Sequence, residues 1–249
     1  MALVSIVTPV YNSERYIEET ISSVRAQTYE HWEHILVDDC STDSSESLIK
    51  ALQKQDDRIK YFRLEKNGGA AISRNKGISM AKGDYLTFLD ADDIWFPEFI
   101  TKSISALKKN NVTFVFSSYK RFDENLTPLL KDFIVPEKVR YDDILKSNSI
   151  SCLTAFLDIK IMGKKYMPLI RKRQDMGLWI SYLKEIDYAL GIQEPLAIYR
   201  IRKDSLSRDK KKLLKSQWYF YSKVEKLGFF TSIYYMVHWM IRGFLKYQG

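Results

Sequence analysis

The residues of this chain that are best suited to chemistry are three carboxylates that follow an apolar run. The run 85–89 is typical of a buried strand, and Asp90, Asp92 and Asp93 follow it directly. Unpaired carboxylates are costly to bury, so this strand must end with its acids at an edge or in a cleft. On an extended backbone Asp90 and Asp92 point the same way, and they could hold one divalent cation, or one cation and one hydroxyl. The alternative is an Asp-rich turn and helix cap.

Two other predicted strands also end in polar residues. The strand 4–7 is followed by Thr8-Pro9-Val10-Tyr11-Asn12, and the strand 32–37 by Asp38-Asp39-Cys40-Ser41-Thr42-Asp43. Ligands of open α/β sheets bind at the carboxyl ends of strands, so these acids are expected to share one crevice with those at 90–92. Like charges repel, and such a crevice needs a cation. The alternative is that the acids at 38–43 only cap the next helix.

Strands and helices alternate in the first half of the chain. This order predicts a fold of the α/β class, with one mostly parallel sheet flanked by helices. Strands are expected at 4–7, 32–37, 59–64 and 85–89, with helices from 13 onward, around 48–52 and at 70–80. Further elements are a helix at 99–109, a strand at 112–119, loop with short elements at 120–150, a weak strand at 151–159, a helix following 171–175 and a closing strand at 190–200.

Composition and charge set the broad class. The 249 residues are 45% hydrophobic and 28% charged, which is typical of one large globular domain or a domain with an appendage. Cys40 and Cys152 are far apart, and we interpret both as reduced thiols of a cytoplasmic protein. Of the net charge of +8, residues 200–249 carry +9, from twelve Lys/Arg and three Asp/Glu, so the preceding body is near neutral. This asymmetry indicates that the tail touches an anionic surface.

Taken together and in this order, the motifs at 8–12, 37–43 and 89–93 resemble those of the family-2 glycosyltransferases. The resemblance covers about residues 3–207. It implies the GT-A fold and an inverting enzyme that uses a nucleotide-sugar donor. It also implies a glycosyltransferase domain at 1–205, with a nucleotide-sugar half at 1–110 and an acceptor half at 111–205. From its own charge and aromatic residues, the remaining part at 206–249 is expected to be a helical membrane-associating segment.

The resemblance assigns the donor side of the site. Thr8, Pro9 and Tyr11 match the first nucleotide-contacting loop, and Asp38 with Asp39 matches the acidic pair that recognises uracil and ribose.

The Asp-x-Asp motif of the family matches the acids after the fourth strand. Asp90 would face the ribose, Asp92 would coordinate Mn²⁺ or Mg²⁺ at the diphosphate, and Asp93 is expected to support its neighbours or cap the helix after Pro97. Arg74 matches a basic position near the base and diphosphate.

The same resemblance assigns the acceptor side. Asp175 matches the catalytic base of a Glu-Asp pair, but here its neighbour is Gln174, which places the acceptor contacts in question rather than the base. Arg202 replaces the usual His of a closing motif that continues through Ser205 and Ser207, and it could hold the diphosphate. In this chemistry the acceptor hydroxyl loses its proton to Asp175 and displaces the diphosphate with inversion, giving a β-linkage from an α-linked donor.

The C-terminal segment suits a membrane interface. Residues 229–241 contain no ionised side chain and many aromatics, with Lys223 and Lys226 before them and Arg242 and Lys246 after. The run is too short for a predicted spanning helix, which needs about 20 apolar residues. We expect peripheral binding to the inner face of the cell membrane; the alternative is a helix packed on the catalytic body.

The expected activity is transfer of a sugar from a UDP-linked donor to a lipid-linked saccharide in the biosynthesis of O-antigen, capsule or another surface polysaccharide. Two alternatives are a nucleotidyltransferase and a non-enzymatic basic protein that binds membrane or nucleic acid. The first would want a Gly-rich loop with Lys or Arg after the first strand, where 8–12 has none. Charge confined to the tail disfavours nucleic acid as a partner.

Overall fold

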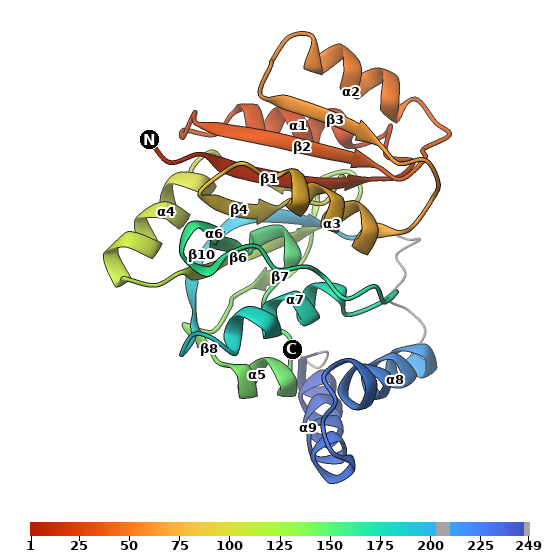
Figure 1. Cartoon of the computed structure of the whole chain (residues 1–249), viewed down its shortest axis with the longest axis vertical. Helices are drawn as coiled ribbons and strands as arrows, with labels where there is room; N and C mark the ends of the chain where they lie inside the picture. Colours follow the sequence, from red (N-terminus) through yellow and green to blue (C-terminus); the bar gives the residue numbers. More distant parts are fainter. Residues whose placement is uncertain (203–209, 247–249) are drawn as a thin grey trace.

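One sheet organises the molecule. The computed structural model describes residues 1–202 and 210–246, and within these ranges ten strands form a single sheet flanked by helices (Figure 1). The strands are β1 Val4–Val10, β2 Trp32–Asp38, β3 Ile59–Arg63, β4 Tyr85–Phe88, β5 Ile94–Trp95, β6 Phe114–Phe122, β7 Pro128–Phe133, β8 Lys138–Val139, β9 Phe156–Asp158 and β10 Ala189–Arg200. The helices are α1 Ile17–Arg25, α2 Ser45–Gln53, α3 Ala70–Met80, α4 Phe99–Asn110, α5 Tyr141–Lys146, the 3₁₀ turn η1 Cys152–Thr154, α6 Ile159–Met162, α7 Gln174–Leu183, α8 Lys210–Tyr219, the π-helical η2 Phe220–Val224 and α9 Phe229–Lys246.

The sheet order is β3-β2-β1-β4-β9-β6-β10-β5, with β7 beside β6 and β8 beside β10. The first four of these strands are parallel to one another, and so are β6 and β10, while the short β9 is antiparallel between β4 and β6. The predicted α/β class with a mostly parallel central sheet is confirmed. Each residue of β2 is buried, because the strand lies inside the sheet.

Several predicted boundaries were wrong. The first strand continues past Val7 to Val10, and Pro9 fits inside it because β4, the neighbour on one side, pairs only as far as Val7. The region 120–150 is more regular than expected, since β6 extends to Phe122 and β7 forms a hairpin with it. At 151–159 a 3₁₀ turn takes the place of the first half of the predicted strand.

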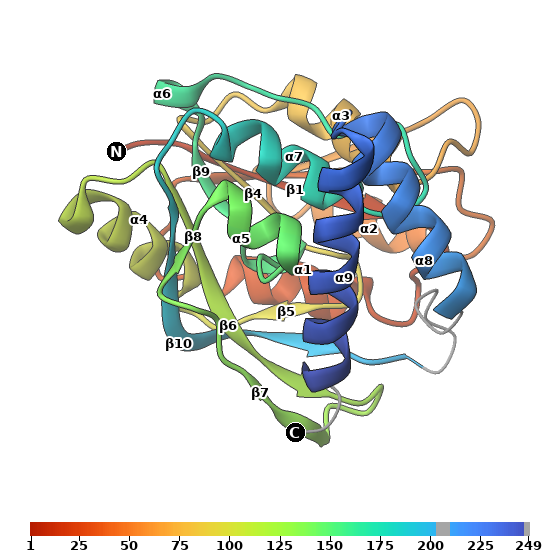
Figure 2. The same cartoon turned by 90° about the horizontal axis from the view of Figure 1, so that it is seen from below.

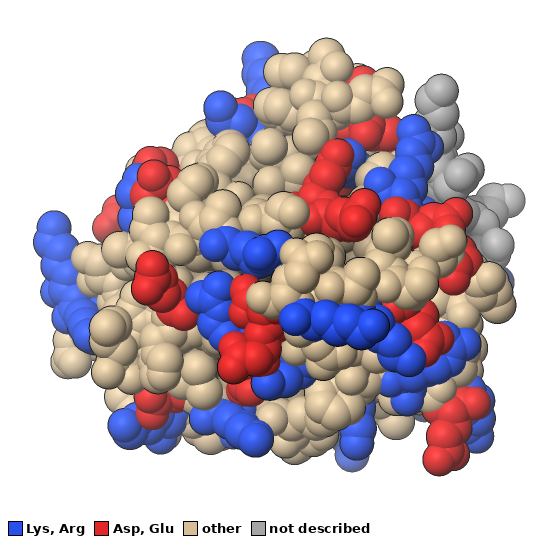
Figure 3. Space-filling model, turned by 90° about the horizontal axis from the view of Figure 1, so that it is seen from above, with Lys and Arg blue, Asp and Glu red and all other residues tan. Residues whose placement is uncertain are grey.

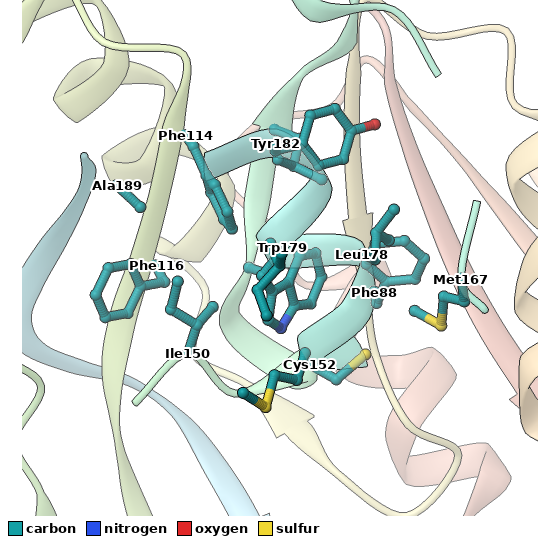
Figure 4. Packing of buried hydrophobic residues seen from close by; sticks show 14 of the residues in the cluster. Phe88, Phe114, Phe116, Ile150, Cys152, Met167, Leu178, Trp179, Tyr182 and Ala189 are labelled. Carbon is teal, nitrogen blue, oxygen red and sulfur yellow. The ribbon is translucent and has the colours of Figure 1, made fainter. Parts of the chain in front are cut away.

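Trp179 lies at the centre of the largest core. Its ring packs edge-on against Phe88 of β4, with 5.8 Å between centroids, and in a tilted arrangement against Phe114 of β6, with 5.5 Å between centroids (Figure 4). The predicted helix after 171–175 is therefore confirmed, and its apolar face fixes α7 against the sheet. Both cysteines are free, Cys152 being buried in the same core.

The C-terminal helices pack on the body with one side. Phe220 and Tyr221 are fully buried in the Trp179 core, and Tyr235 of α9 donates to Asp142 of α5 at 2.7 Å. Figure 2 shows α9 lying over α5, with α8 beside it. The predicted helical appendage is thus present and shares the core of the body. Its predicted boundary at 205/206, together with Ser205 and Ser207, lies outside the described residues.

On the side of the molecule opposite α9, basic and acidic side chains are interspersed (Figure 3). This mixture agrees with the near-neutral charge of the body in the sequence.

Candidate active site

The acidic residues after β4 lie in a turn. The Asp93 N–H donates to the Asp90 carbonyl at 3.1 Å, so the backbone is not extended there. The expected extended backbone at 90–92 was therefore wrong, and the two carboxylates have different partners. Asp90 pairs with Arg74, whereas Asp92 Oδ2 accepts a hydrogen bond from Arg202 Nη1 at 3.0 Å.

Asp93 has a structural role. It is 1% exposed, and its Oδ1 accepts the Arg200 N–H at 2.8 Å. Its carbonyl accepts from the Thr20 hydroxyl at 2.9 Å. Since α4 begins at Phe99 with no side-chain cap, Asp93 supports its neighbours and does not cap that helix.

Electrostatics favour a cation at this loop. Burial raises the pKa of Asp92 above its usual range, and Asp90 raises it further, while Arg202 opposes both. Burial, together with Asp92 and Asp90, raises the pKa of Asp93 well above its usual range. These shifts indicate that the arginines leave part of the negative charge uncompensated.

The donor set suits a metal that is shared with a phosphate ligand. Within 1–202 and 210–246, no group of three His, Cys, Asp or Glu side chains could by itself hold a metal. Mg²⁺ is commonly bound by one or two carboxylates together with substrate phosphates. The partly exposed carboxylate of Asp92, next to Asp90, fits that pattern.

Arg74 of α3 connects the acidic loop to α7. Its side chain is 9% exposed and its Nη2 pairs with Asp90 Oδ1. With the Gln174 amide oriented to satisfy its neighbours, Gln174 Oε1 accepts from Arg74 Nη1 at 3.1 Å and Nε2 donates to the Ile170 carbonyl at 2.9 Å. Gln174 therefore binds both the buried arginine and the segment that leads into α7.

The charge of Arg74 is well compensated. Burial alone would lower the pKa of Arg74, but the acids Asp90 and Asp175 raise it above its usual range. Asp175 thus lies within electrostatic reach of the arginine that holds Asp90. Asp90 and the predicted base Asp175 thus both act on the pKa of the same buried cation, Asp90 through a direct ion pair.

The backbone adopts a left-handed conformation two residues before Asp175. Arg173 is in the left-handed region, φ 68°, and reverses the chain just before α7 begins at Gln174. Its guanidinium lies 5.4 Å from the Trp239 ring of α9. Asp175 follows at the N-terminal turn of the helix, half-buried.

Asp38 and Asp39 follow each other but bind different groups. Asp38 is fully buried, its Oδ1 accepts the Ser41 N–H at 2.8 Å, and its Oδ2 accepts from Tyr61 and Arg63 at 2.6 and 3.1 Å. Both of its oxygens therefore have protein partners. Its role with uracil and ribose stays a prediction, and the geometry supports a structural contribution.

Asp39 holds the loop at 67–69 in place through hydrogen bonds. Its two carboxylate oxygens accept the N–H groups of Gly68 and Gly69, each at 2.7 Å, and its carbonyl accepts from Asn67 Nδ2 at 3.0 Å. This loop leads directly into α3, which carries Arg74.

The first predicted loop begins inside β1. Thr8 is buried, with Oγ1 2.8 Å from His34 Nε2 of β2, and Pro9 is half-buried. Tyr11 is 53% exposed beyond the strand end. The N–H of Asp39 donates to the Val10 carbonyl at 2.8 Å, so the ends of β1 and β2 lie side by side.

Arg200 is the site residue that the sequence analysis missed. Its Nε donates to the Asp92 carbonyl at 2.8 Å and its backbone N–H to Asp93, so one residue of β10 fixes the acidic turn. A signal was present: Arg200 and Arg202 alternate on an extended segment and so lie on one side of it.

The whole chain is similar to proteins of one enzyme family. The model of "Glycosyl transferase family 2" matches residues 5–162. The putative teichuronic acid biosynthesis glycosyltransferase TuaG of Bacillus subtilis is 41% identical over 95% of this chain and 94% of its own. The Escherichia coli UDP-Glc:alpha-D-GlcNAc-diphosphoundecaprenol beta-1,3-glucosyltransferase WfgD is 36% identical over 98% of this chain and 95% of its own.

Solved structures show the same fold. S. aureus TarS 1-349 in complex with UDP-GlcNAc superposes with a TM-score of 0.74 over 98% of this chain and 73% of that one, at 19% identity. The mannosyltransferase PcManGT from Pyrobaculum calidifontis, in complex with GDP-Man and Mn²⁺, gives 0.67 over 90% and 64%, at 16% identity.

Proposed function

The chain belongs to glycosyltransferase family 2 and has the GT-A fold, and from this premise we propose that it transfers a sugar from a UDP-linked donor to a lipid-linked saccharide with inversion. It is a glycosyltransferase, so the nucleotidyltransferase and non-enzymatic alternatives are wrong. One relative is a putative teichuronic acid biosynthesis glycosyltransferase, and two are UDP-Glc:alpha-D-GlcNAc-diphosphoundecaprenol glucosyltransferases. The proposal assigns this chain to surface-polysaccharide biosynthesis.

One observation carries the assignment of roles. Arg74 binds Asp90 and Gln174 and is within electrostatic reach of Asp175. A donor held at the acidic turn and a hydroxyl held at the start of α7 would therefore meet at one place. That is the arrangement a direct displacement between two substrates requires.

The proposed reaction is a single displacement. Asp175 takes the proton of the acceptor hydroxyl while the hydroxyl oxygen attacks the anomeric carbon, and the bond from that carbon to the diphosphate oxygen breaks. The products are the β-linked saccharide, the nucleoside diphosphate and a protonated Asp175. One carboxylate suffices as the base, because no covalent intermediate forms and the diphosphate leaves without being protonated. Inverting glycosidases also avoid a covalent intermediate, but they need a second carboxyl group to protonate the leaving group.

The leaving diphosphate needs positive charge. Asp92 would hold Mn²⁺ or Mg²⁺ together with the diphosphate oxygens, and the bound ion would neutralise the charge that develops on the leaving group. Arg202, now 3.0 Å from Asp92 and 40% exposed, can turn to the diphosphate when the carboxylate has another partner. Asp39, Thr8, Pro9 and Tyr11 would bind the nucleoside.

The proposed location is the inner face of the membrane. None of the described helices is long and apolar enough to cross a bilayer. The outer side of α9 exposes large apolar side chains at helical spacing, with Phe230 84% exposed. These side chains are Phe229, Phe230, Ile233, Tyr234, Val237, Met240 and Ile241. Such a surface, flanked by Lys226 and Arg242, suits shallow insertion among anionic headgroups.

The test is a donor screen with Mn²⁺ and a GlcNAc-diphospho-lipid acceptor, following release of the nucleoside diphosphate. We expect turnover with a UDP-sugar, and losses of at least about 100-fold in Asp92→Ala and Asp175→Asn, since general bases contribute about 10²–10⁴-fold. Asp57→Asn is the matched control, because Asp57 is an exposed acid before β3.

Two results would contradict the proposal. Absence of nucleoside diphosphate release with each donor would remove the assigned activity. An α-linked product from an α-linked donor, identified by NMR of the anomeric proton, would remove the inverting mechanism.

A further inference from the structure

A basic groove lies next to the segment that leads into α7. A groove of about 460 Å³ separates the segment before α7 from α8. We call it the basic groove; the lining residues used below are Leu169, Ile170, Arg171, Lys215 and Tyr219. None of these belongs to the donor residues at 8–11, 38–39, 74 or 90–92.

The groove is tied to the catalytic machinery. The carbonyls of Ile170 and Arg171 accept hydrogen bonds from the Gln174 amide, at 2.9 and 3.2 Å, and Gln174 also binds Arg74. Arg171 precedes Asp175 by four residues, which span at most about 14 Å even when fully extended. A ligand in the groove is therefore within reach of the proposed base.

The lining has the chemistry of an anionic amphiphile. Arg171 and Lys215 supply two cations, and among the residues that the structure describes no carboxylate lines the groove. Leu169 is 71% exposed and Tyr219 54% exposed, so apolar surface stands next to the cations. Cations of this kind bind phosphate oxygens through charge-assisted hydrogen bonds, and the apolar surface can cover the start of a hydrocarbon chain.

The position of the groove relative to the membrane fits the same ligand. Its α8 wall continues through η2 into α9, and α8 and α9 lie side by side (Figure 2). A ligand that extends from the exposed face of α9 toward Asp175 could pass along this wall.

We propose that the basic groove binds the diphosphate of the acceptor, with Arg171 and Lys215 on its oxygens and the first part of the lipid against Leu169 and Tyr219. This inference rests on the proposed function. The diphosphate of the donor is assigned to Asp92 and Arg202, so a second diphosphate site is required only by a lipid-diphosphate acceptor.

The test measures binding and does not depend on turnover. Farnesyl diphosphate is titrated into the full-length protein with saturating UDP and Mn²⁺, which occupy the donor side. We expect Lys215→Glu and Arg171→Glu each to raise the Kd by about 10- to 100-fold, since a hydrogen bond to a charged group contributes that much. Lys54→Glu, an exposed lysine at the end of α2, is the matched control and should leave the Kd unchanged.

Farnesol, which lacks the diphosphate, should bind equally to wild type and variants. The inference is overturned if the wild type does not bind farnesyl diphosphate, or if the two reversals leave the Kd unchanged. It is also overturned if the reversals weaken binding to phosphatidylglycerol vesicles as much as binding to farnesyl diphosphate, since the groove would then recognise headgroups in general. Retained binding together with no sugar transfer would refute the proposed function and leave the groove as a lipid-diphosphate site.

Discussion

Replacing Arg200 with alanine should destabilise the protein strongly, because this residue joins three segments inside the molecule. Its side chain is 2% exposed. Nε donates to the Asp92 carbonyl at 2.8 Å, Nη1 donates to the Glu124 carbonyl at 2.9 Å, and Nη2 pairs with Glu19. The guanidinium also lies 4.6 Å from the Tyr16 ring.

The expected cost follows from what alanine leaves behind. The carbonyls of Asp92 and Glu124 lose their donor, and each part-buried acceptor left unsatisfied costs about 1–2 kcal/mol. The contact with Tyr16 adds about 1 kcal/mol. Glu19 is 51% exposed, so water replaces its partner at little cost. The free energy of unfolding should fall by about 3–5 kcal/mol, which lowers Tm by about 6–20 °C in a chain of this size.

The assay is urea unfolding followed by tryptophan fluorescence, with Arg15→Ala as the control. Arg15 shares two partners with Arg200: it lies 3.3 Å from the Glu124 carboxylate and 5.3 Å from the centre of the Tyr16 ring. Its side chain, however, is 63% exposed. Its removal should cost less than about 1 kcal/mol. The reasoning is refuted if Arg200→Ala unfolds within about 1 kcal/mol of the wild type, or if the two variants lose the same amount.

Three further outcomes are expected. Burial lowers the pKa of His34 to about 3 from an ordinary 6.5, so the unfolded chain binds a proton that the native state does not. Stability should therefore fall as pH falls through that window, by about 2 kcal/mol from pH 7 to 5, and urea unfolding of His34→Gln should lack this part of the loss. Asp39→Asn places an amide N–H against the N–H groups of Gly68 and Gly69. It should raise the KM for the nucleotide-sugar by about tenfold in steady-state kinetics. An unchanged KM would contradict the proposed role of Asp39 in binding the nucleoside. Phe230→Asp should weaken flotation with anionic vesicles by at least about tenfold and leave Tm unchanged, because the side chain is exposed; equal flotation would count against the membrane proposal.

Local sequence patterns were sufficient for the elements of the fold. The strands β1 and β2 are short, largely apolar runs that end in polar residues, and α1 buries Ile17, Ile21 and Val24, which recur at helical spacing. Periodicity of this kind depends on neighbours in the chain, so it can be read without the structure. The same reasoning placed the acids at the carboxyl ends of the strands.

The partners of those acids depend on residues far along the chain. The turn at 90–93 is fixed by Arg200, more than 100 positions later, and Asp38 is buried because Tyr61 and Arg63 of the adjacent strand bind it. Nothing in the spacing of the Asp-x-Asp motif indicates that its two acids pair with different arginines. Pairing across the sheet and between helices is a tertiary property that a local pattern does not contain.

The two hypotheses for the C-terminal segment, membrane binding and packing on the catalytic body, do not exclude each other. One side of α9 packs on α5, through Tyr235 and Asp142, while Phe230 on another side is exposed. Because Phe220 and Tyr221 are part of the main core, removing the chain from about residue 216 would disrupt the body as well as the exposed surface. Point substitutions on the exposed side test membrane binding without this effect.

The replacement of the usual Glu by Gln174 has a physical consequence for the site. Arg74 is buried and carries one positive charge, which Asp90 already pairs with directly. A neutral amide at 174 accepts a hydrogen bond from Arg74 without adding a second carboxylate to the same cation, and its Nε2 binds the carbonyls at 170 and 171. A glutamate would offer those carbonyls a negative oxygen in place of a donor. The amide therefore joins the acidic turn, α3 and the segment before Asp175 into one hydrogen-bonded unit. Because the same unit forms a wall of the basic groove, a ligand bound in the groove would influence the position of the proposed base, Asp175.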